Sequence, residues 1–363
     1  MDTFGNPSSL HTHGAAAAGL LKRSRAAIGE ALGERFLKEG QIVFTSCGTE
    51  ATSLALFGTA HAKARRSAKT ILTTDSEHPS VDRALAALEE EGFSVVRVPT
   101  VGGALDLDTV RAHCTPDLFM VSMMLVNNET GAVYPVREVF ALARAANPQV
   151  VCHTDAVQGF LKLPFIPRQL GADLVTLSAH KIGGPKGVGA LFISERMKKE
   201  KRIVPFLLGG GQEAGLRSGT ENMIGIAGFA AAAKSGMAGA RDAQANMAAL
   251  SARLIAGLAD TEITVNRPLN AAPHIVSITL PDIKSETMLH YLAGQGISVS
   301  AGSACSSHKA GPSSVLLAFG LPAARADCTL RISLSPDTTA ADIDALLAAL
   351  ATGVDTLVRI RHS

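Results

Sequence analysis

Short apolar runs alternate with longer helix-like stretches through the first two thirds of the chain. Strands are predicted at 41–46, 71–74, 94–99, 119–126, 150–155, 174–178 and 189–193, with a helix over 49–64 after the first. Most of these runs are apolar throughout, as expected of strands that are buried on both faces. The pattern predicts an α/β fold, with a mostly parallel seven-stranded sheet and helices on both faces.

The pattern changes in the last third of the chain. An Ala-, Gly- and Met-rich helical stretch is followed by shorter apolar runs at 274–280 and 331–334. A final helix is predicted over 340–359, with an apolar face made of Ile343, Leu346, Leu347, Leu350, Val354 and Leu357. We therefore expect a large domain over 1–234 and a smaller α+β domain over 235–363.

Charge and hydropathy indicate which kinds of molecule this protein binds. The 34 Lys and Arg residues nearly balance the 32 Asp and Glu residues, and no long run carries one sign. This balance disfavours nucleic acid or an anionic membrane as the main partner, so we expect a small ligand. No run approaches the roughly 20 apolar residues of a membrane span. Because no signal-peptide pattern opens the sequence either, we expect a cytoplasmic protein.

Five cysteines are scattered along the chain without a Cys-x-x-Cys pair: Cys47, Cys114, Cys152, Cys305 and Cys328. They predict neither a disulfide framework nor a metal site. Four lie in or beside apolar segments and are interpreted as small core residues. Cys305 lies in a small, polar stretch over 300–308, so it is either a mobile nucleophilic thiol or an ordinary loop cysteine.

The strongest chemical signal is Ser-Ala-His-Lys-Ile-Gly-Gly-Pro-Lys-Gly over 178–187. Lys181 in this motif follows Asp155 by 26 residues. A lysine that forms a Schiff base and a carboxylate that holds a pyridinium nitrogen are what a pyridoxal 5'-phosphate (PLP) enzyme needs. We interpret Lys181 as the Schiff-base lysine. Asp155 either holds the ring nitrogen or caps the next helix, and Gln158 is a candidate donor to the phenolic oxygen of the ring.

The Thr-Ser-Cys-Gly-Thr-Glu loop over 45–50 joins a predicted strand to a predicted helix. Its free N–H groups and the helix dipole favour a phosphate there, with Gly48 allowing close approach and Thr49 adding a hydroxyl. The alternative is an ordinary helix cap. The lysine motif favours the phosphate site.

Three further polar segments are candidates for the same site. His78 follows a strand and either stacks on the cofactor ring or packs as a structural histidine. Asn128 either donates to the phenolic oxygen or belongs to an ordinary turn. Arg217 and Thr220 lie in a glycine-rich stretch that is either a flexible surface loop or an anion site reaching a neighbouring subunit.

Taken together, these motifs resemble those of cysteine desulfurases of the class V aminotransferase fold, which supply sulfur for iron–sulfur clusters. They occur in the family's order from Phe-Gly-Asn-Pro-Ser-Ser over 4–9 to Arg-Ile-Ser-Leu over 331–334. The resemblance implies fold type I of the PLP-dependent transferases. It also implies conversion of L-cysteine to L-alanine, with the sulfur passing to Cys305 as a persulfide.

The resemblance assigns a role to each candidate residue. It implies that PLP is bound by Gly48, Thr49, His78, Asn128, Asp155, Gln158, Ser178, His180, Lys181 and Thr220. Arg331, together with Asn6, would bind the substrate, while Lys181, Cys305 and His78 would be catalytic. Because Thr220 would serve the partner subunit's phosphate, a homodimer with shared active sites is expected. A sulfur-acceptor protein, such as an iron–sulfur scaffold, would be a further partner.

The sequence departs from the family pattern at three places. Met1 stands almost directly before the segment over 4–9, so the family's usual N-terminal strand is expected to be missing. Cys47 and Ser335 each replace a glycine, and we expect both to be tolerated. Two alternatives stay open: another class V lyase, such as a selenocysteine lyase, and a non-catalytic scaffold that keeps the fold.

Overall fold

The computed structural model describes residues 3–62, 68–301 and 311–360. The chain divides into two compact units. The large unit comprises Met1–Val98, Leu107–Leu125 and Pro135–Gly239, and the small unit comprises Pro99–Asp106, Val126–Tyr134 and Ala240–Ser363. Two short early segments thus group with the small unit, which differs from the contiguous division expected at residue 234.

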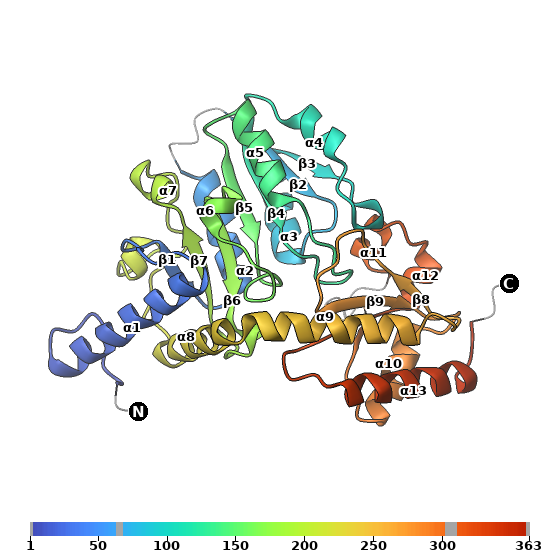
Figure 1. The fold of residues 1–363 in the computed structure, drawn as a ribbon. Helices are drawn as coiled ribbons and strands as arrows, with labels where there is room; N and C mark the ends of the chain where they lie inside the picture. The colour runs from blue at the N-terminus through green and yellow to red at the C-terminus, as the bar shows by residue number, and fades with distance from the viewer. Residues whose placement is uncertain (1–2, 63–67, 302–310, 361–363) are drawn as a thin grey trace. The chain divides into compact units, whose positions relative to one another are not determined.

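The large unit is built on a seven-stranded sheet in the order β1-β7-β6-β5-β4-β2-β3 (Figure 1). The strands are β1 (Ile42–Thr45), β2 (Thr70–Thr74), β3 (Ser94–Val98), β4 (Leu118–Met124), β5 (Val151–Asp155), β6 (Leu174–Ser178) and β7 (Gly189–Ile193). The ladders from β3 to β6 are all parallel. Only β7 runs antiparallel to its neighbours, β6 and β1. The predicted strands and the mostly parallel sheet are confirmed.

Helices pack around the sheet, and several of them contribute buried apolar side chains to its core. The helices of the large unit are α1 (Thr12–Ala31), α2 (Gly48–Ala60), α3 (Pro79–Glu90), α4 (Leu107–His113), α5 (Val136–Ala146), α6 (Pro167–Leu170), α7 (Glu195–Lys199) and α8 (Met223–Ala238). This unit also contains two short 3-10 turns, η3 (Ala179–Ile182) and η4 (Glu213–Gly215). Buried side chains of α2 and α3 form one core with the strands, and α5 packs on β4.

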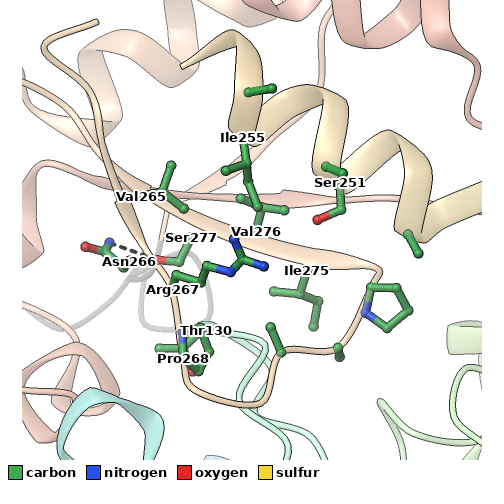
Figure 2. A pocket seen from close by; sticks show the side chains of 16 residues that line it. Thr130, Ser251, Ile255, Val265, Asn266, Arg267, Pro268, Ile275, Val276 and Ser277 are labelled. Carbon is green, nitrogen blue, oxygen red and sulfur yellow. Dashed lines mark hydrogen bonds between the residues drawn. The ribbon is translucent and has the colours of Figure 1, made fainter. Parts of the chain in front are cut away.

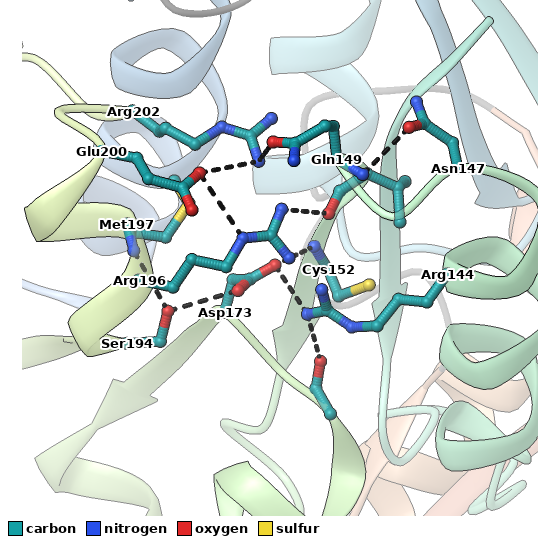
Figure 3. Close-up of polar contacts among 12 residues, drawn as sticks. Arg144, Asn147, Gln149, Cys152, Asp173, Ser194, Arg196, Met197, Glu200 and Arg202 are labelled. Carbon is teal, nitrogen blue, oxygen red and sulfur yellow. Dashed lines mark hydrogen bonds and ion pairs between the residues drawn. The ribbon is translucent and has the colours of Figure 1, made fainter. Parts of the chain in front are cut away.

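A polar network ties together the segments at the amino-terminal ends of β5 and β6 (Figure 3). The buried carboxylate of Asp173 accepts hydrogen bonds from Arg144 Nη2 at 2.8 Å and from the Cys152 backbone N–H at 3.0 Å. Ser194 Oγ donates to its other oxygen at 3.2 Å. Because the site motifs follow the carboxyl ends of these strands, this network stabilises the sheet at the edge opposite the site.

The small unit contains a four-stranded antiparallel sheet in the order β10-β11-β9-β8. Its strands are β8 (Thr264–Asn266), β9 (Ile275–Thr279), β10 (Ser300–Ala301) and β11 (Thr329–Ser333). Its helices are η2 (Val101–Gly103), α9 (Ala240–Gly257), α10 (Ser285–Gly294), α11 (Ser314–Ala318), α12 (Ala323–Asp327) and α13 (Ala340–Thr356). The apolar face predicted for α13 packs into the core of this unit, although the helix ends at Thr356 and not at Arg359.

Within the described part of the chain, no single helix is both long and apolar enough to cross a membrane. Only α8 and α9 taken together, as a bent pair, meet the test of length and composition. The described residues also contain no group of three or more His, Cys, Asp or Glu side chains arranged to hold a metal ion.

Candidate active site

Polar residues gather where the parallel strands of the large unit end. His78 comes four residues after β2, Asp155 is the last residue of β5, and Ser178 is the last residue of β6. Lys181 lies in η3, directly after β6. Carboxyl ends of parallel strands meet at one edge of a sheet, which is where open α/β folds bind ligands.

Asp155 is buried and sits beside a positive charge. Its Oδ1 accepts the backbone N–H of Val157 at 2.9 Å, so one oxygen does cap the turn that follows. Its Oδ2 makes no hydrogen bond with any described residue. Burial raises the pKa of Asp155 to about 6, while the Val157 N–H and the charge of Lys181 act in the opposite direction. Both interpretations of Asp155 are therefore compatible, because one oxygen caps the turn and the other is available.

The amino terminus of α2 adjoins the same strand ends. A Cβ placed on Gly48 would lie 3.1 Å from Val157 Cγ2 and 3.5 Å from Ser178 Cβ, so this turn packs directly against the segments after β5 and β6. The N-cap residue, Cys47, makes no side-chain hydrogen bond to the helix. The first N–H groups of α2 are therefore not capped by that residue, and Thr49 is exposed beside them.

His78 is the N-cap of α3. Its Nδ1 accepts the backbone N–H of Ser80 at 3.1 Å, so the proton of the neutral ring lies on Nε2. Burial lowers the pKa of His78, and the charge of Lys181 lowers it further. The imidazole is thus a neutral donor through Nε2 at neutral pH.

Three more predicted residues lie at or just after the carboxyl ends of β5 and β6: Gln158, Ser178 and His180. His180 is exposed, and its Nδ1 lies 2.8 Å from Ser178 Oγ. Burial lowers the pKa of His180, as do the charges of Lys181 and Lys186. Gln158 is half-buried, and its amide makes no hydrogen bond with the described residues. The structure therefore brings these side chains to the edge that carries Asp155.

Two predicted residues of the large unit are not placed in this cluster by any contact. Thr220 is exposed and makes no hydrogen bond with a described residue, and Asn6 is exposed with its Oδ1 accepting the Ser8 N–H at 2.9 Å. Arg217 forms an ion pair with Glu50 in the first turn of α2, with Nε 2.7 Å from Oε1. The stretch over 209–222 is therefore anchored to α2 at Arg217.

Arg331 and Asn128 belong to the small unit. The Arg331 guanidinium donates from Nη1 to the Asn128 carbonyl at 2.8 Å and from Nη2 to Ser300 Oγ at 3.0 Å. Its buried Nε has no partner among the described residues, and neither does the buried Oδ1 of Asn128. Buried polar atoms without a protein partner are typical of a site that binds a polar ligand.

Comparison with known proteins identifies the family. The family model described as aminotransferase class V matches residues 1–346. The chain belongs to the class V aminotransferase family. The resemblance predicted from the motifs is therefore confirmed at the family level. Members of this family depend on PLP.

Several relatives of this class V aminotransferase are named cysteine desulfurases, which is more specific than the family name. Cysteine desulfurase NifS of Azotobacter vinelandii is 37% identical over 350 residues, covering 95% of this chain and 85% of the relative. A cysteine desulfurase of Cereibacter sphaeroides is 39% identical over 361 residues, covering 98% and 90%. A solved NifS-like protein has a TM-score of 0.90 at 33% identity, covering 98% of this chain and 93% of that one. A structure of SspA in complex with cysteine has a TM-score of 0.79 at 30% identity, covering 93% of each.

Cys305, the predicted nucleophile of this class V aminotransferase, lies outside the described residues. Of the other cysteines, Cys152 and Cys328 are buried as predicted. Cys47 and Cys114 are only half-buried, so their interpretation as core residues is wrong. Cys47 is half-exposed because it occupies the N-cap position of α2, where the chain leaves the sheet.

Two largely buried carboxyl groups of this class V aminotransferase, Glu77 and Glu129, were not predicted from the sequence. Glu77 Oε1 accepts Thr74 Oγ1 and the Met124 N–H, both at 2.9 Å, and burial raises its pKa to about 8. Glu129 Oε2 accepts Ser313 Oγ at 2.6 Å, and burial raises its pKa to about 7. Both stand beside a predicted site residue, His78 or Asn128, and that adjacency was the available signal.

Proposed function

We propose that this chain is a PLP-dependent cysteine desulfurase, which converts L-cysteine to L-alanine and transfers the sulfur to its own Cys305. One observation carries the proposal: a lysine at the end of β6 acts electrostatically on a buried carboxylate at the end of β5, beside an N-terminal helix turn with no side-chain cap. Two cysteine desulfurases at 37% and 39% identity over nearly the whole chain support the substrate.

The residues of the large unit fit PLP. The space beside Gly48 is too small for a Cβ without strain, so the helix turn comes as close as it can to the strand ends. The N–H groups at the start of α2, with Thr49, would hold the phosphate. Asp155 would hold the ring nitrogen through Oδ2, and Lys181 would attach the aldehyde. His78 would stack on the ring, with Gln158, Asn128, Ser178 and His180 completing the polar contacts.

Bound PLP supplies an electron-accepting ring that weakens the bonds around the substrate's α-carbon. Lys181 Nζ takes up the proton lost from that carbon. Arg331 holds the substrate carboxylate, together with Asn6, and its unpartnered Nε is a donor that the described residues do not use. The thiolate of Cys305 accepts the sulfur, so the Cys305 sulfur gains a new S–S bond as the substrate's C–S bond breaks. The electron pair of the broken C–S bond stays with the substrate's β-carbon, and His78, with its proton on Nε2, would supply the proton that this carbon takes up.

The wider setting of the reaction belongs to the same proposal. Thr220 reaches the phosphate of the partner subunit in a homodimer with shared active sites. The persulfide on Cys305 is passed to a sulfur-acceptor protein, such as an iron–sulfur scaffold. This transfer takes place in the cytoplasm.

A comparison of three proteins tests the proposal. The wild type, reconstituted with PLP and mixed with L-cysteine and a reductant, should form alanine and sulfide in equal amounts. Cys305→Ala should keep the PLP absorbance and lose at least about 100-fold in sulfide release, since no thiolate accepts the sulfur. Cys114→Ala is the matched control and should behave like the wild type.

Three outcomes would count against the proposal in different ways. Unchanged sulfide release from Cys305→Ala would refute the persulfide route and favour another class V lyase, such as a selenocysteine lyase. Bound PLP with no product in the wild type would favour a non-catalytic scaffold. Failure of Lys181→Ala to abolish the covalent PLP adduct that borohydride traps would refute the site itself.

A further inference from the structure

A pocket of about 340 Å³ opens in the small unit (Figure 2). Its walls come from α9, β8, β9 and the loop over 267–273, all of which belong to this unit. A volume of this size lies at the lower end of the range that binds small molecules. The pocket is therefore large enough for a short organic ligand.

The space exists because α9 carries small side chains on one face. Ala248, Ala252 and Ala256 follow each other at intervals of four residues, which places them above one another along the helix. The neighbouring face of the same helix bears Met247 and Leu250, which pack into the core of the unit. The sequence thus fills the core side of α9 and leaves the pocket side open.

Among the described residues that line the pocket, Arg267 is the one that is ionisable. It is exposed, and it forms neither an ion pair nor a hydrogen bond with any residue that the structure describes. Its side chain extends from the loop into the space between the helix and β9 (Figure 2). Because no described carboxylate lines the pocket, the positive charge of Arg267 is uncompensated there.

Most other polar groups in the lining are already satisfied. The Asn266 side-chain amide donates to Ser277 Oγ at 3.1 Å and to Thr279 Oγ1 at 2.8 Å. Thr130 Oγ1 donates to Asn127 Oδ1 at 3.1 Å. The Ser251 hydroxyl, in contrast, makes no hydrogen bond with the described residues and faces the pocket from α9 (Figure 2). The side-chain groups of the described lining that are available to a ligand are thus the Arg267 guanidinium, the Ser251 hydroxyl and, as a donor, the Ser277 hydroxyl.

We propose that this pocket binds a small monocarboxylate with a short apolar body. A guanidinium matches a carboxylate with two parallel hydrogen bonds. Alanine, isoleucine and valine side chains of the lining would cover the apolar body. A free amino acid suits the pocket poorly, because its ammonium group would find no anionic partner in the described lining.

The pocket is distinct from the proposed substrate site, although the two are close along the sheet. Ser277, which lines the pocket, is the register partner of Arg331 on β11. Arg331 itself does not line the pocket. A test must therefore separate binding at Arg267 from binding at Arg331.

Calorimetric titration of the PLP-bound protein with hexanoate tests the proposal. Saturable binding of one hexanoate per chain is expected, and saturating L-alanine should not displace it. Arg267→Gln, which removes the charge, and Ala252→Leu, which fills the space, should each weaken binding at least about tenfold. Arg241→Gln is the matched control. Like Arg267, Arg241 is an exposed arginine of the small unit, but it lies on α9 outside the pocket. Hexanol and 6-aminohexanoate should bind more weakly than hexanoate.

Several results would overturn the proposal. These are the absence of saturable binding to the wild type, equal binding to Arg267→Gln, an equal loss in Arg241→Gln, or displacement by L-alanine. Ala252→Leu keeps the charge and Arg267→Gln keeps the space, and both substitutions are at exposed positions, so a folding defect does not explain a loss in both. Hexanoate binding is measured without sulfur release, so this test can fail while the proposed function holds, and the reverse is also true.

Discussion

At the scale of single residues, the decisive feature is a pair of buried carboxyl groups, of which one raises the pKa of the other. Burial raises the pKa of Glu77 to about 8, and the charge of Asp155 contributes to that rise. The pKa of Asp155 is raised only to about 6, because the Val157 N–H and Lys181 oppose the effect of burial. At neutral pH the proton therefore stays on Glu77 while Asp155 is ionised. A neutral Glu77 leaves Asp155 as the anion of this pair.

This assignment predicts how stability depends on pH. The pKa of Glu77 rises from 4.5 to about 8 on folding, so the folded chain binds the proton more tightly than the unfolded chain. Stability should then fall as pH rises through this window, by about 1.4 kcal/mol per pH unit from this group. Glu77→Gln cannot ionise and should lose less stability between pH 5 and pH 8. Urea unfolding of the PLP-free protein at both pH values measures the difference, and an equal decline in the two proteins would contradict it.

At the scale of elements, the amino terminus of α2 is the proposed phosphate site. Gly48 begins the helix, and Cys47 before it provides no side-chain cap. Glu50 in the first turn is already engaged elsewhere, because it binds Arg217 and accepts the Ser46 N–H at 2.7 Å. The helix end thus keeps its positive dipole and its free N–H groups.

A single methyl group at Gly48 should therefore weaken cofactor binding. In Gly48→Ala the added Cβ would lie 3.1 Å from Val157 Cγ2, so the Val157 side chain or the turn must shift by a few tenths of an ångström. Overpacking of this kind costs about 1–3 kcal/mol, which corresponds to a loss of about ten- to hundredfold in PLP affinity. Gly239→Ala is the matched control, because no described atom lies within 4 Å of a Cβ placed there and its φ is negative. Equal PLP dissociation constants for the two variants would refute the role of this turn.

Elements with a local signal could be predicted from the sequence, and those set by distant partners could not. The runs that became β4, β5 and β6 are apolar throughout, and burial on both faces requires that pattern. The antiparallel direction of β7 could not be predicted from its own residues, because it depends on the strands with which β7 pairs. Arg217 was predicted to lie either in a flexible surface loop or in an anion site, but it binds Glu50, which lies 167 residues away in the sequence.

The same distinction applies to the small unit. The apolar face of α13 was visible because it repeats within one helix, and it packs into the core as predicted. The bond between Arg331 and the Asn128 carbonyl spans 203 residues, and only the folded unit reveals it. The pocket beside Arg267 was likewise hidden, because it arises only where alanines of α9 face β8 and β9 in the folded unit.

At the scale of the whole molecule, the question is whether Thr220 serves its own subunit or the partner. Arg217, three residues earlier, forms an ion pair with Glu50 in α2 of the same chain, so it lies near the phosphate site proposed for its own subunit. Thr220 itself is exposed and has no hydrogen-bond partner among the described residues, as expected of a group that acts on another chain. Only a dimer with two different subunits separates these possibilities.

A mixed dimer of Lys181→Ala and Thr220→Asp subunits makes that separation. Only the Thr220→Asp subunit can attach PLP covalently. If Thr220 acts across the dimer, this site receives the intact Thr220 of the partner and should bind PLP as the wild type does. If it acts within the chain, the introduced carboxylate would repel the phosphate and weaken PLP binding at least about tenfold, since like charges at close range are unfavourable. The reciprocal control places both substitutions in one subunit beside a wild-type partner, and the two expectations then exchange. PLP titration of both dimers measures the outcome, and strong binding in the control with weak binding in the first dimer would refute a site shared between subunits.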